Sequence, residues 1–245
     1  MHSGVLLCVG MGMRERILDA ALECFTEDGY ERTTVARIRE HSGVSNGALF
    51  HHFSSKDAIA GALYVEAMRS VQDGFWDVVR QSPATLREAV GGVIRQLLSW
   101  IEDNPERARF LYGRGHLDWT TDAGGQLQEL NRDLAGAYQD WLAPFVVRGE
   151  AKDLPIAVVV AIVTGPAHAI AQRWLAGQLP GPLLHYAGDL IDAAVAGMSG
   201  VPTKRPRRHH QPAQGRVRIQ LLGSEGSIIA EGNAVAELTP VKHAR

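Results

Sequence analysis

The sequence predicts an all-α protein, and three observations lead to this fold class. Apolar residues recur at three- and four-residue spacing through most of the first 200 residues, which is the period of an amphipathic helix. Gly and Pro residues interrupt these runs where helices would end. The chain has 245 residues, of which 45% are hydrophobic, so it can bury a sizeable core in one or two domains.

Residues 34–53 predict two short helices joined by a tight turn. Apolar residues repeat at helical spacing on both sides of Gly43, which lies where the first helix must end. Ser45 follows and can cap the second helix. A helix, a short glycine-containing turn and a capped helix are the signature of a helix-turn-helix, whose second helix enters the major groove of DNA.

The flanking residues extend this pattern. The run from Arg14 to Asp28 predicts an amphipathic helix that ends at Gly29, and a further helix begins after Ser54-Ser55. Residues 13–60 resemble the DNA-binding domain of the tetracycline-repressor (TetR) family. One motif, A-x-x-x-F-x-x-x-G-Y-x-x-T-T-V, comprises Ala21, Phe25, Gly29, Tyr30, Thr33, Thr34 and Val35. The other, G-V-S-x-G-x-L-Y-x-H-F-x-x-K, has Phe50 where the family usually has Tyr.

Most of the predicted DNA contacts lie in the second helix of this pair, the recognition helix. Ser45, Asn46 and Gly47 open this helix, at the end that meets base edges. Asn46 can bond bidentately to adenine, and Gly47 lets the DNA backbone approach closely. The full set expected to contact DNA is Thr34, Arg37, Arg39, Ser45, Asn46, Gly47, Phe50, His51, His52 and Lys56. Alternatives are a solvent-facing Asn46, a Thr34 that only caps its helix, and a Lys56 that is a solvated cation.

Cations are few in this segment. Residues 34–56 contain Arg37, Arg39 and Lys56 against the single acid Glu40, so helix N-termini and backbone amides must share the phosphate contacts. Arg39 stands where the family usually has Ala, and we expect its stem to lie across the interface between the two helices. The net charge of the whole chain is −2, which argues neither for nor against DNA binding.

The resemblance assigns further roles at the end of the recognition helix. It implies that Phe50 replaces a tyrosine whose hydroxyl contacts phosphate, so that this contact becomes apolar, for example to a thymine methyl group. His52 matches a histidine of the family, whereas His51 lies at a variable position. Adjacent side chains on a helix point about 100° apart, so we expect no metal between these histidines and no metal or cofactor elsewhere.

Residues 61–200 predict a helical domain for effector binding and dimerisation. Helices are expected to about Gln81, from Leu86 to Asn104, through Phe110, from about Gly125 to Val147, and from Pro182 to Met198. Aromatic and polar residues in this half could line a pocket for an apolar or aromatic ligand, although each could equally be a core residue. They are Trp100, Tyr112, His116, Trp119, Tyr138, Trp141, His168 and Gln172.

Residues 154–172 carry no formal charge, so a membrane span has to be considered. The Thr164-Gly165-Pro166 interruption and the absence of a second such segment argue against a span, and we expect a buried helix that Pro166 kinks or restarts. With the helix ending at Met198, it could pair with its symmetry mate in a homodimer, which is where the TetR family usually dimerises.

The two ends of the chain differ in composition from the rest. Residues 1–12 predict a disordered extension, and Met13 is a plausible true start. Residues 201–245 hold eight Lys/Arg and three Asp/Glu and predict a basic, disordered tail. The alternative is a hairpin, because residues 216–221 alternate like a strand and Gly223 to Gly226 could turn the chain back. Two cysteines give no disulfide framework and fit a reducing cytoplasm.

The motif therefore predicts a cytoplasmic transcriptional regulator that binds double-stranded DNA at a palindromic operator. The resemblance implies a homodimeric repressor that a small-molecule effector releases. One alternative is a DNA-binding dimer without an effector. An enzyme that uses His116 or His168 is the other, and no spacing of acids or nucleophiles supports it.

Overall fold

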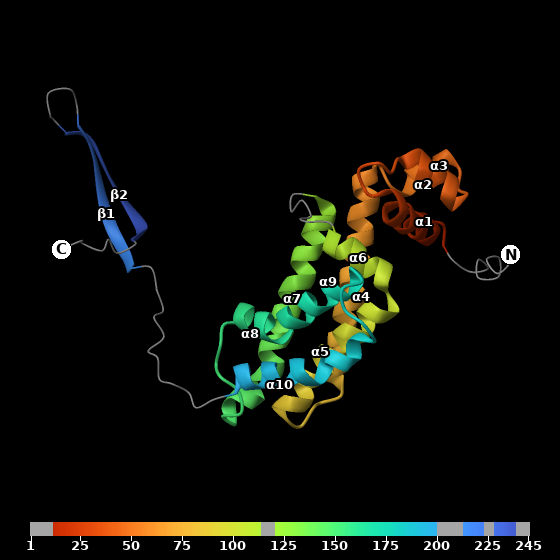
Figure 1. Cartoon of the computed structure of the whole chain (residues 1–245). Coiled ribbons are helices and arrows are strands. Elements are labelled where there is room, and N and C mark those ends of the chain that lie inside the picture. Colours follow the sequence, from red (N-terminus) through yellow and green to blue (C-terminus); the bar gives the residue numbers. More distant parts are fainter. Residues whose placement is uncertain (1–11, 114–120, 200–212, 223–227, 239–245) are drawn as a thin grey trace. The chain divides into compact units, whose positions relative to one another are not determined.

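The computed structural model of the chain describes residues 12–113, 121–199, 213–222 and 228–238. Met1–Pro202 forms one compact unit and Thr203–Arg245 forms a second. In the described part of the first unit, all regular structure is helical (Figure 1), which confirms the predicted fold class. Its elements are α1 (Met13–Asp28), α2 (Val35–Ser42), α3 (Asn46–His52), α4 (Lys56–Arg80), α5 (Leu86–Asp103), α6 (Pro105–Gly113), α7 (Asp122–Val147), α8 (Ile156–Val163), α9 (Gly165–Leu175), the 3-10 turn η1 (Leu183–Tyr186) and α10 (Ala187–Met198).

Helices α1, α2 and α3 pack around an apolar core that includes the fully buried Ile38 and Leu49. Helix α2 ends at Gly43, whose φ of 65° lies in the left-handed region that glycine adopts without strain. The Arg16 guanidinium donates a hydrogen bond to the Ser42 carbonyl oxygen over 2.7 Å. The predicted glycine turn is therefore present, and a side chain of α1 holds it in place.

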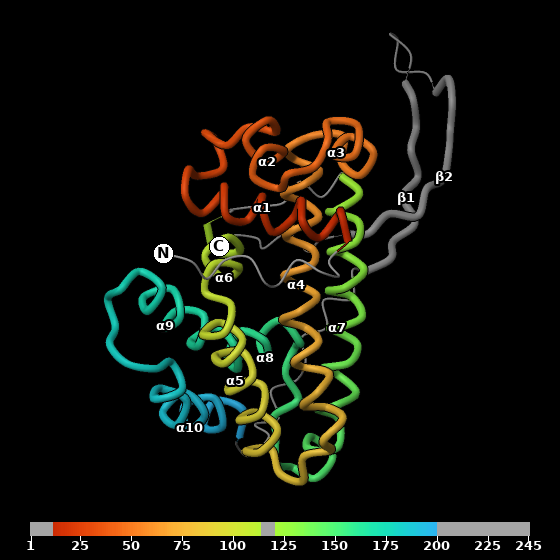
Figure 2. Tube along the Cα trace, turned by 90° about the vertical axis from the view of Figure 1, so that its right-hand side faces the viewer, coloured from red at the N-terminus to blue at the C-terminus, as the bar shows by residue number. Residues whose placement is uncertain are grey.

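Helix α4 joins this three-helix unit to the rest of the chain (Figure 2). Its first turns contribute Ile59 and Leu63 to the core of α1–α3, and its later turns contribute Phe75 and Val78 to a second core. One continuous helix therefore crosses the domain boundary that the sequence predicts at residue 60.

Helix α5 lies at the centre of the second core and packs against α4 and α10. Thr85 and Glu88 form a capping box at its start. A Cβ atom at Gly92 would lie 2.7 Å from Cγ1 of Val78, so glycine permits the close approach of α4 and α5. The helix ends at Asn104, immediately before a proline, as the sequence predicts.

The uncharged run forms two helices, because α8 ends at Thr164 and α9 restarts with Pro166 in its first turn. Pro155 occupies the N-cap position of α8. Ile156–Leu175 is long and apolar enough to cross a membrane, judged by length and composition, and 22% of its most apolar window is buried. Much of this apolar surface is therefore not covered within the described part of one chain.

The second unit contains an antiparallel pair of strands, β1 (Ala213–Leu222) and β2 (Ile228–Leu238). Their register runs from Ala213 opposite Leu238 to Leu222 opposite Ile228, with an irregularity at Leu221/Leu222. The composition favours a disordered tail, whereas the structure has the hairpin alternative at these residues. The basic linker at 204–210 and the extension at 1–11 lie outside the described residues.

Candidate nucleic-acid interface and ligand cavity

Helix α3 presents a row of exposed side chains opposite its buried residue Leu49. Ser45 caps the helix, since its hydroxyl accepts a hydrogen bond from the Ala48 amide over 3.2 Å. Asn46 and Gly47 follow in the first turn and are exposed. A Cβ atom at Gly47 would meet nothing within 4 Å. This end of α3 is thus open, as a base-reading surface has to be.

The far end of α3 carries large exposed side chains. Phe50 is 50% exposed, which is unusual for a phenylalanine, and His51 and His52 are exposed beside it. The two imidazole rings lie edge to face with centroids 5.2 Å apart. In the described part of the chain, no group of three or more His, Cys, Asp or Glu side chains could hold a metal ion.

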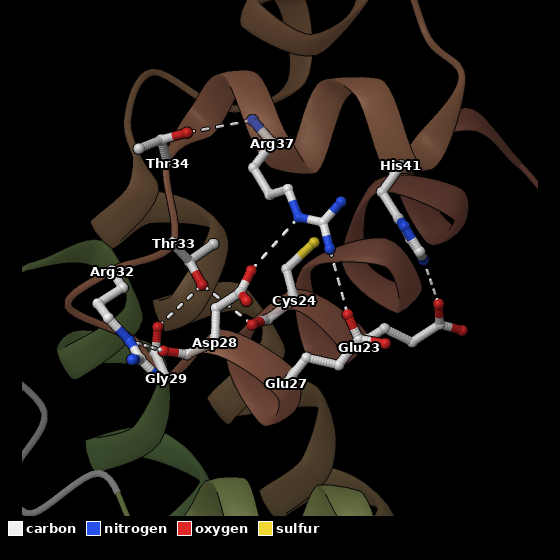
Figure 3. A network of polar contacts seen from close by, with 10 residues as sticks. All are labelled: Glu23, Cys24, Glu27, Asp28, Gly29, Arg32, Thr33, Thr34, Arg37 and His41. Atoms are coloured by element: carbon white, nitrogen blue, oxygen red, sulfur yellow. Dashed lines mark hydrogen bonds and ion pairs between the residues drawn. The ribbon is translucent and has the colours of Figure 1, made fainter.

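Arg37 points back from α2 to α1 (Figure 3). Its Nε lies 3.3 Å from Asp28 Oδ2, and its Nη2 lies 3.2 Å from Glu27 Oε2. The hydrogen bond to Asp28 raises the pKa of Arg37. Thr34 begins the same helix, and its hydroxyl accepts a hydrogen bond from the Arg37 amide over 3.2 Å. Arg37, which is expected to contact phosphate, is therefore paired with two acids in the absence of DNA.

Thr33 has a structural role that its residue type and its place in the chain do not predict. It is 1% exposed, and its hydroxyl donates towards the carbonyl oxygens of Cys24, at 3.0 Å, and Gly29, at 2.9 Å (Figure 3). These bonds fix the turn from α1 into the capped start of α2. Its place in the family motif is a sequence signal for this role. A threonine that precedes a helix is otherwise expected to cap that helix.

The remaining two cations also have partners. Arg39 is partly buried, and its Nη2 lies 3.2 Å from Oε1 of the neighbouring Glu40. Lys56 donates to the carbonyl oxygens of Tyr30, at 2.8 Å, and Glu31, at 3.4 Å. Lys56 is therefore not a purely solvated cation, because its ammonium group holds the turn between α1 and α2. Its contact with a DNA phosphate stays a prediction.

A cavity of about 430 Å³ lies among helices α4 to α9. The sequence-predicted residues that line it are Trp100, Tyr112, Tyr138, His168 and Gln172. Trp141 does not line it, which corrects the prediction. Its ring is buried edge-on against the rings of Phe75 and Tyr138, so its spacing on α7 reflects core packing. His116 and Trp119 lie outside the described residues.

Two hydrogen-bonded pairs supply polar groups to the cavity. The Tyr112 hydroxyl and Nδ1 of His168 are 2.6 Å apart, and the Gln72 amide donates to Asn131 Oδ1 over 3.2 Å. Burial raises the pKa of Tyr112 to about 12 and lowers the pKa of His168. Both side chains are therefore neutral near pH 7. Gln72 and Asn131 were not predicted, since an amide on a helix has no distinguishing sequence pattern.

Helix α6 connects the cavity to the three-helix unit. Tyr112 lines the cavity from this helix, whereas Phe110 packs into the core of α1–α3 with its ring stacked 5.7 Å from that of Phe25. Arg107 Nη2 lies 3.3 Å from Asp19 Oδ1 on α1. A change in the cavity that moves α6 would therefore act directly on α1.

Comparison with known proteins agrees with this arrangement. Residues 17–63 match the model of the bacterial regulatory proteins, tetR family. The HTH-type transcriptional repressor Rv1474c of Mycobacterium tuberculosis is 38% identical over 104 residues, which are 40% of this chain and 50% of that protein. The repressor AcnR of Corynebacterium diphtheriae is 37% identical over 101 residues, 41% of this chain and 46% of that protein. The chain thus spans about half the length of these curated relatives.

Solved structures extend the likeness to the fold of the helical unit. The ketosteroid transcriptional regulator KstR2 of Mycobacterium tuberculosis matches with a TM-score of 0.62 at 20% identity, over 78% of this chain and 97% of that one. The regulator FadR of Bacillus subtilis, solved in complex with stearoyl-CoA, matches with a TM-score of 0.61 at 20% identity, over 75% of this chain and 98% of that one.

A capped helix α3 on a three-helix unit, followed by a helical domain, has the architecture of a helix-turn-helix DNA-binding protein. Residues 17–63 of the chain match the DNA-binding domain of the tetR family of bacterial regulators. The curated relatives named above are transcriptional repressors and not enzymes.

Proposed function

We propose that this protein is a homodimeric repressor that binds a palindromic DNA operator and leaves it when a small, largely apolar or aromatic ligand occupies the cavity. The observation that carries the proposal is the open N-terminal turn of α3, where Asn46 and Gly47 are exposed after the Ser45 cap. The curated relatives named above are repressors, which supports this direction of control. Action on DNA implies a cytoplasmic location.

Base reading is proposed for Asn46 and close backbone approach for Gly47. Phe50 provides an apolar contact, and His51 and His52 provide contacts at the phosphates. DNA contacts are also proposed for Thr34 at the start of α2 and for Arg37 and Arg39 on that helix. To contact DNA, Arg37 has to exchange its carboxylate partners Glu27 and Asp28 for a phosphate. The bonds that it loses and the bonds that it gains are both charge-assisted and similar in strength.

Dimerisation is proposed through α8, α9 and α10. The exposed large apolar residues include Val158 and Val160 on α8 and Leu184 in η1. These side chains add to the apolar surface of Ile156–Leu175, of which 22% of the most apolar window is buried, and a partner is expected to cover such surface. A two-fold dimer would carry two α3 helices, which suits an operator with two symmetric half-sites about one helical turn apart.

The test of DNA recognition is selection of bound duplexes from a random pool, followed by affinity measurement on the selected site. Asn46→Ala should lower the affinity for that site by about 1–3 kcal/mol and relax selectivity at one base pair of each half-site. Gln128→Ala, which removes an exposed amide on α7, is the control and should change nothing. Equal affinity of the wild type for every duplex would refute the proposal.

A DNA-binding dimer without an effector is the second candidate. It is favoured if the cavity serves only as packing space, and the closed pair Tyr112–His168 is compatible with that role. A ligand that binds the native protein raises the melting temperature by mass action, so a thermal-shift screen separates the two candidates. Release then requires that the ligand bind the DNA-incompetent state more tightly.

A further inference from the structure

The charges of the cavity lining limit the ligands that the cavity can bind. Among its described lining residues, contributed by helices from α4 to α9, none is Asp, Glu, Lys or Arg. Two of its titratable residues, Tyr112 and His168, are neutral near pH 7 because burial disfavours their charged forms. An ion placed there would lose its hydration without gaining a partner of opposite charge, which is strongly unfavourable.

Flat apolar surfaces form the walls. The rings of Phe75 and Tyr138 stack with centroids 4.1 Å apart, and both residues line the cavity. Trp100 lines it too, and its indole N–H already donates to the Ser70 hydroxyl over 2.9 Å. The Trp100 ring therefore offers the ligand an apolar face rather than a hydrogen bond. Such walls favour a planar apolar body.

One of the two polar pairs of the cavity is Tyr112–His168, whose two heavy atoms are 2.6 Å apart. If the phenol donates to Nδ1, its oxygen can still accept a hydrogen bond from a ligand. If the imidazole donates instead, the phenol proton is available to a ligand acceptor. A ligand hydroxyl suits both arrangements, because it can donate as well as accept.

We infer that this cavity takes an uncharged, flat and mainly apolar molecule bearing a hydroxyl group that hydrogen-bonds to Tyr112 and His168. The inference rests on the proposed function, since it names the chemical class of the effector. It excludes carboxylates, phosphate esters and protonated amines, whose charges would meet no counter-charge among the described lining residues.

Four probes on one three-ring skeleton test the charge requirement at pH 7. They are phenanthrene, 9-phenanthrol, phenanthrene-9-carboxylate and 9-(aminomethyl)phenanthrene, and their dissociation constants are measured on the full chain by calorimetry. The phenol should bind about 10-fold more tightly than the hydrocarbon and more than about 100-fold more tightly than the carboxylate or the amine. Binding of either ion as tightly as the phenol, or of none of the four, would overturn the inference.

Two variants test the hydroxyl assignment. Tyr112→Phe should weaken 9-phenanthrol by about 5- to 10-fold and leave phenanthrene within about twofold of the wild type, and His168→Gln should act in the same direction. Tyr186→Phe is the matched control, since its hydroxyl donates to the Pro180 carbonyl oxygen over 3.0 Å, away from the cavity lining. Unchanged phenol affinity in both cavity variants would overturn the assignment.

The same samples separate this inference from the proposed function. Operator affinity is measured with and without saturating 9-phenanthrol, using the duplex selected above. If the phenol binds with the expected preferences but leaves DNA affinity unchanged, ligand control fails and the cavity chemistry stands. If an ion binds preferentially and releases the operator, ligand control stands and the inference about an uncharged ligand is wrong.

Discussion

The Lys56 ammonium donates a hydrogen bond to the Tyr30 carbonyl oxygen over 2.8 Å and lies 4.3 Å from the centroid of the Tyr30 ring. The pair ties the first residue of α4 to the turn between α1 and α2. Because Thr34 begins α2 a few residues later, this contact helps to fix the orientation of α2 and, through it, of the recognition helix.

Replacement of Lys56 with Met should therefore lower the free energy of unfolding by about 1–2 kcal/mol, since it removes charge-assisted hydrogen bonds and a cation–π contact. Urea denaturation without DNA measures this loss. Arg39→Met is the control, because its partner Glu40 is exposed, and it should cost less than about 0.5 kcal/mol. A variant as stable as the wild type, with only a flatter salt dependence of DNA binding, would restore the simpler role of phosphate contact.

Gly43 and Gly47 should respond oppositely to substitution by Ala. At Gly43 the left-handed backbone and the Arg16 Nη2 atom, 3.3 Å from a Cβ, predict a loss of about 1–2 kcal/mol. At Gly47 the space is open, so the stability should rise by up to about 1 kcal/mol through higher helix propensity. Thermal denaturation compares the two variants.

The Gly47 variant also tests DNA contact without the complication of misfolding. If the DNA backbone lies against Gly47, Gly47→Ala should bind the selected operator at least about 10-fold more weakly than the wild type, as expected for a loss of about 1.4 kcal/mol. Unchanged operator affinity in this stable variant would place the DNA farther from the first turn of α3 than proposed.

The proposed exchange of carboxylate for phosphate at Arg37 makes a prediction about its partner. Glu27→Gln should strengthen operator binding at low salt and make the slope of log affinity against log salt more negative, by up to about 1 unit, because Arg37 loses one of its two carboxylate partners and an acid is removed. Glu129→Gln, an exposed acid on α7, is the matched control. Equal salt slopes for both variants would argue that Arg37 serves only to hold α2 against α1.

Phe110 should couple the two halves of the helical unit. Phe110→Leu keeps an apolar side chain but loses the stack on Phe25, so we expect a loss of about 1–2 kcal/mol in stability. In a protein that still binds ligand with wild-type affinity, the ligand should release DNA less effectively. Paired calorimetry and DNA-binding titrations measure this change, and an undiminished effect of ligand on DNA affinity would exclude α6 as the connection.

The buried His168 predicts a pH dependence of stability. Its pKa lies below the ordinary value of 6.5 in the folded protein because burial disfavours the imidazolium. The unfolded chain therefore binds more protons as the pH falls, and the contribution of His168 to stability is present above pH 6.5 and is lost below it. His168→Gln should lose less stability than the wild type between pH 7 and pH 5, whereas the exposed His51→Gln should follow the wild type.

The sequence by itself determined most of the secondary structure and the likeness of residues 13–60 to the DNA-binding domain of the tetR family. Gly43, Ser45 and the Asn104–Pro105 step mark helix ends by local rules of backbone conformation and capping, so they can be read without knowledge of the fold. The motif also consists of residues that lie close together in the sequence, so it predicts that α3 is the recognition helix. Residue type placed the aromatic Tyr112 and the polar His168 among the residues expected to line the cavity.

The tertiary structure decided what the side chains of those helices contact. Lys56 reaches Tyr30 and Arg37 reaches Glu27 only because α1, α2 and the start of α4 pack together, and no spacing along the chain encodes these pairs. Trp141 and Tyr138 share one helix and one apolar pattern, yet only Tyr138 faces the cavity. Local propensity acts within a few residues, whereas a binding site is built from elements that packing brings together over long separations in sequence.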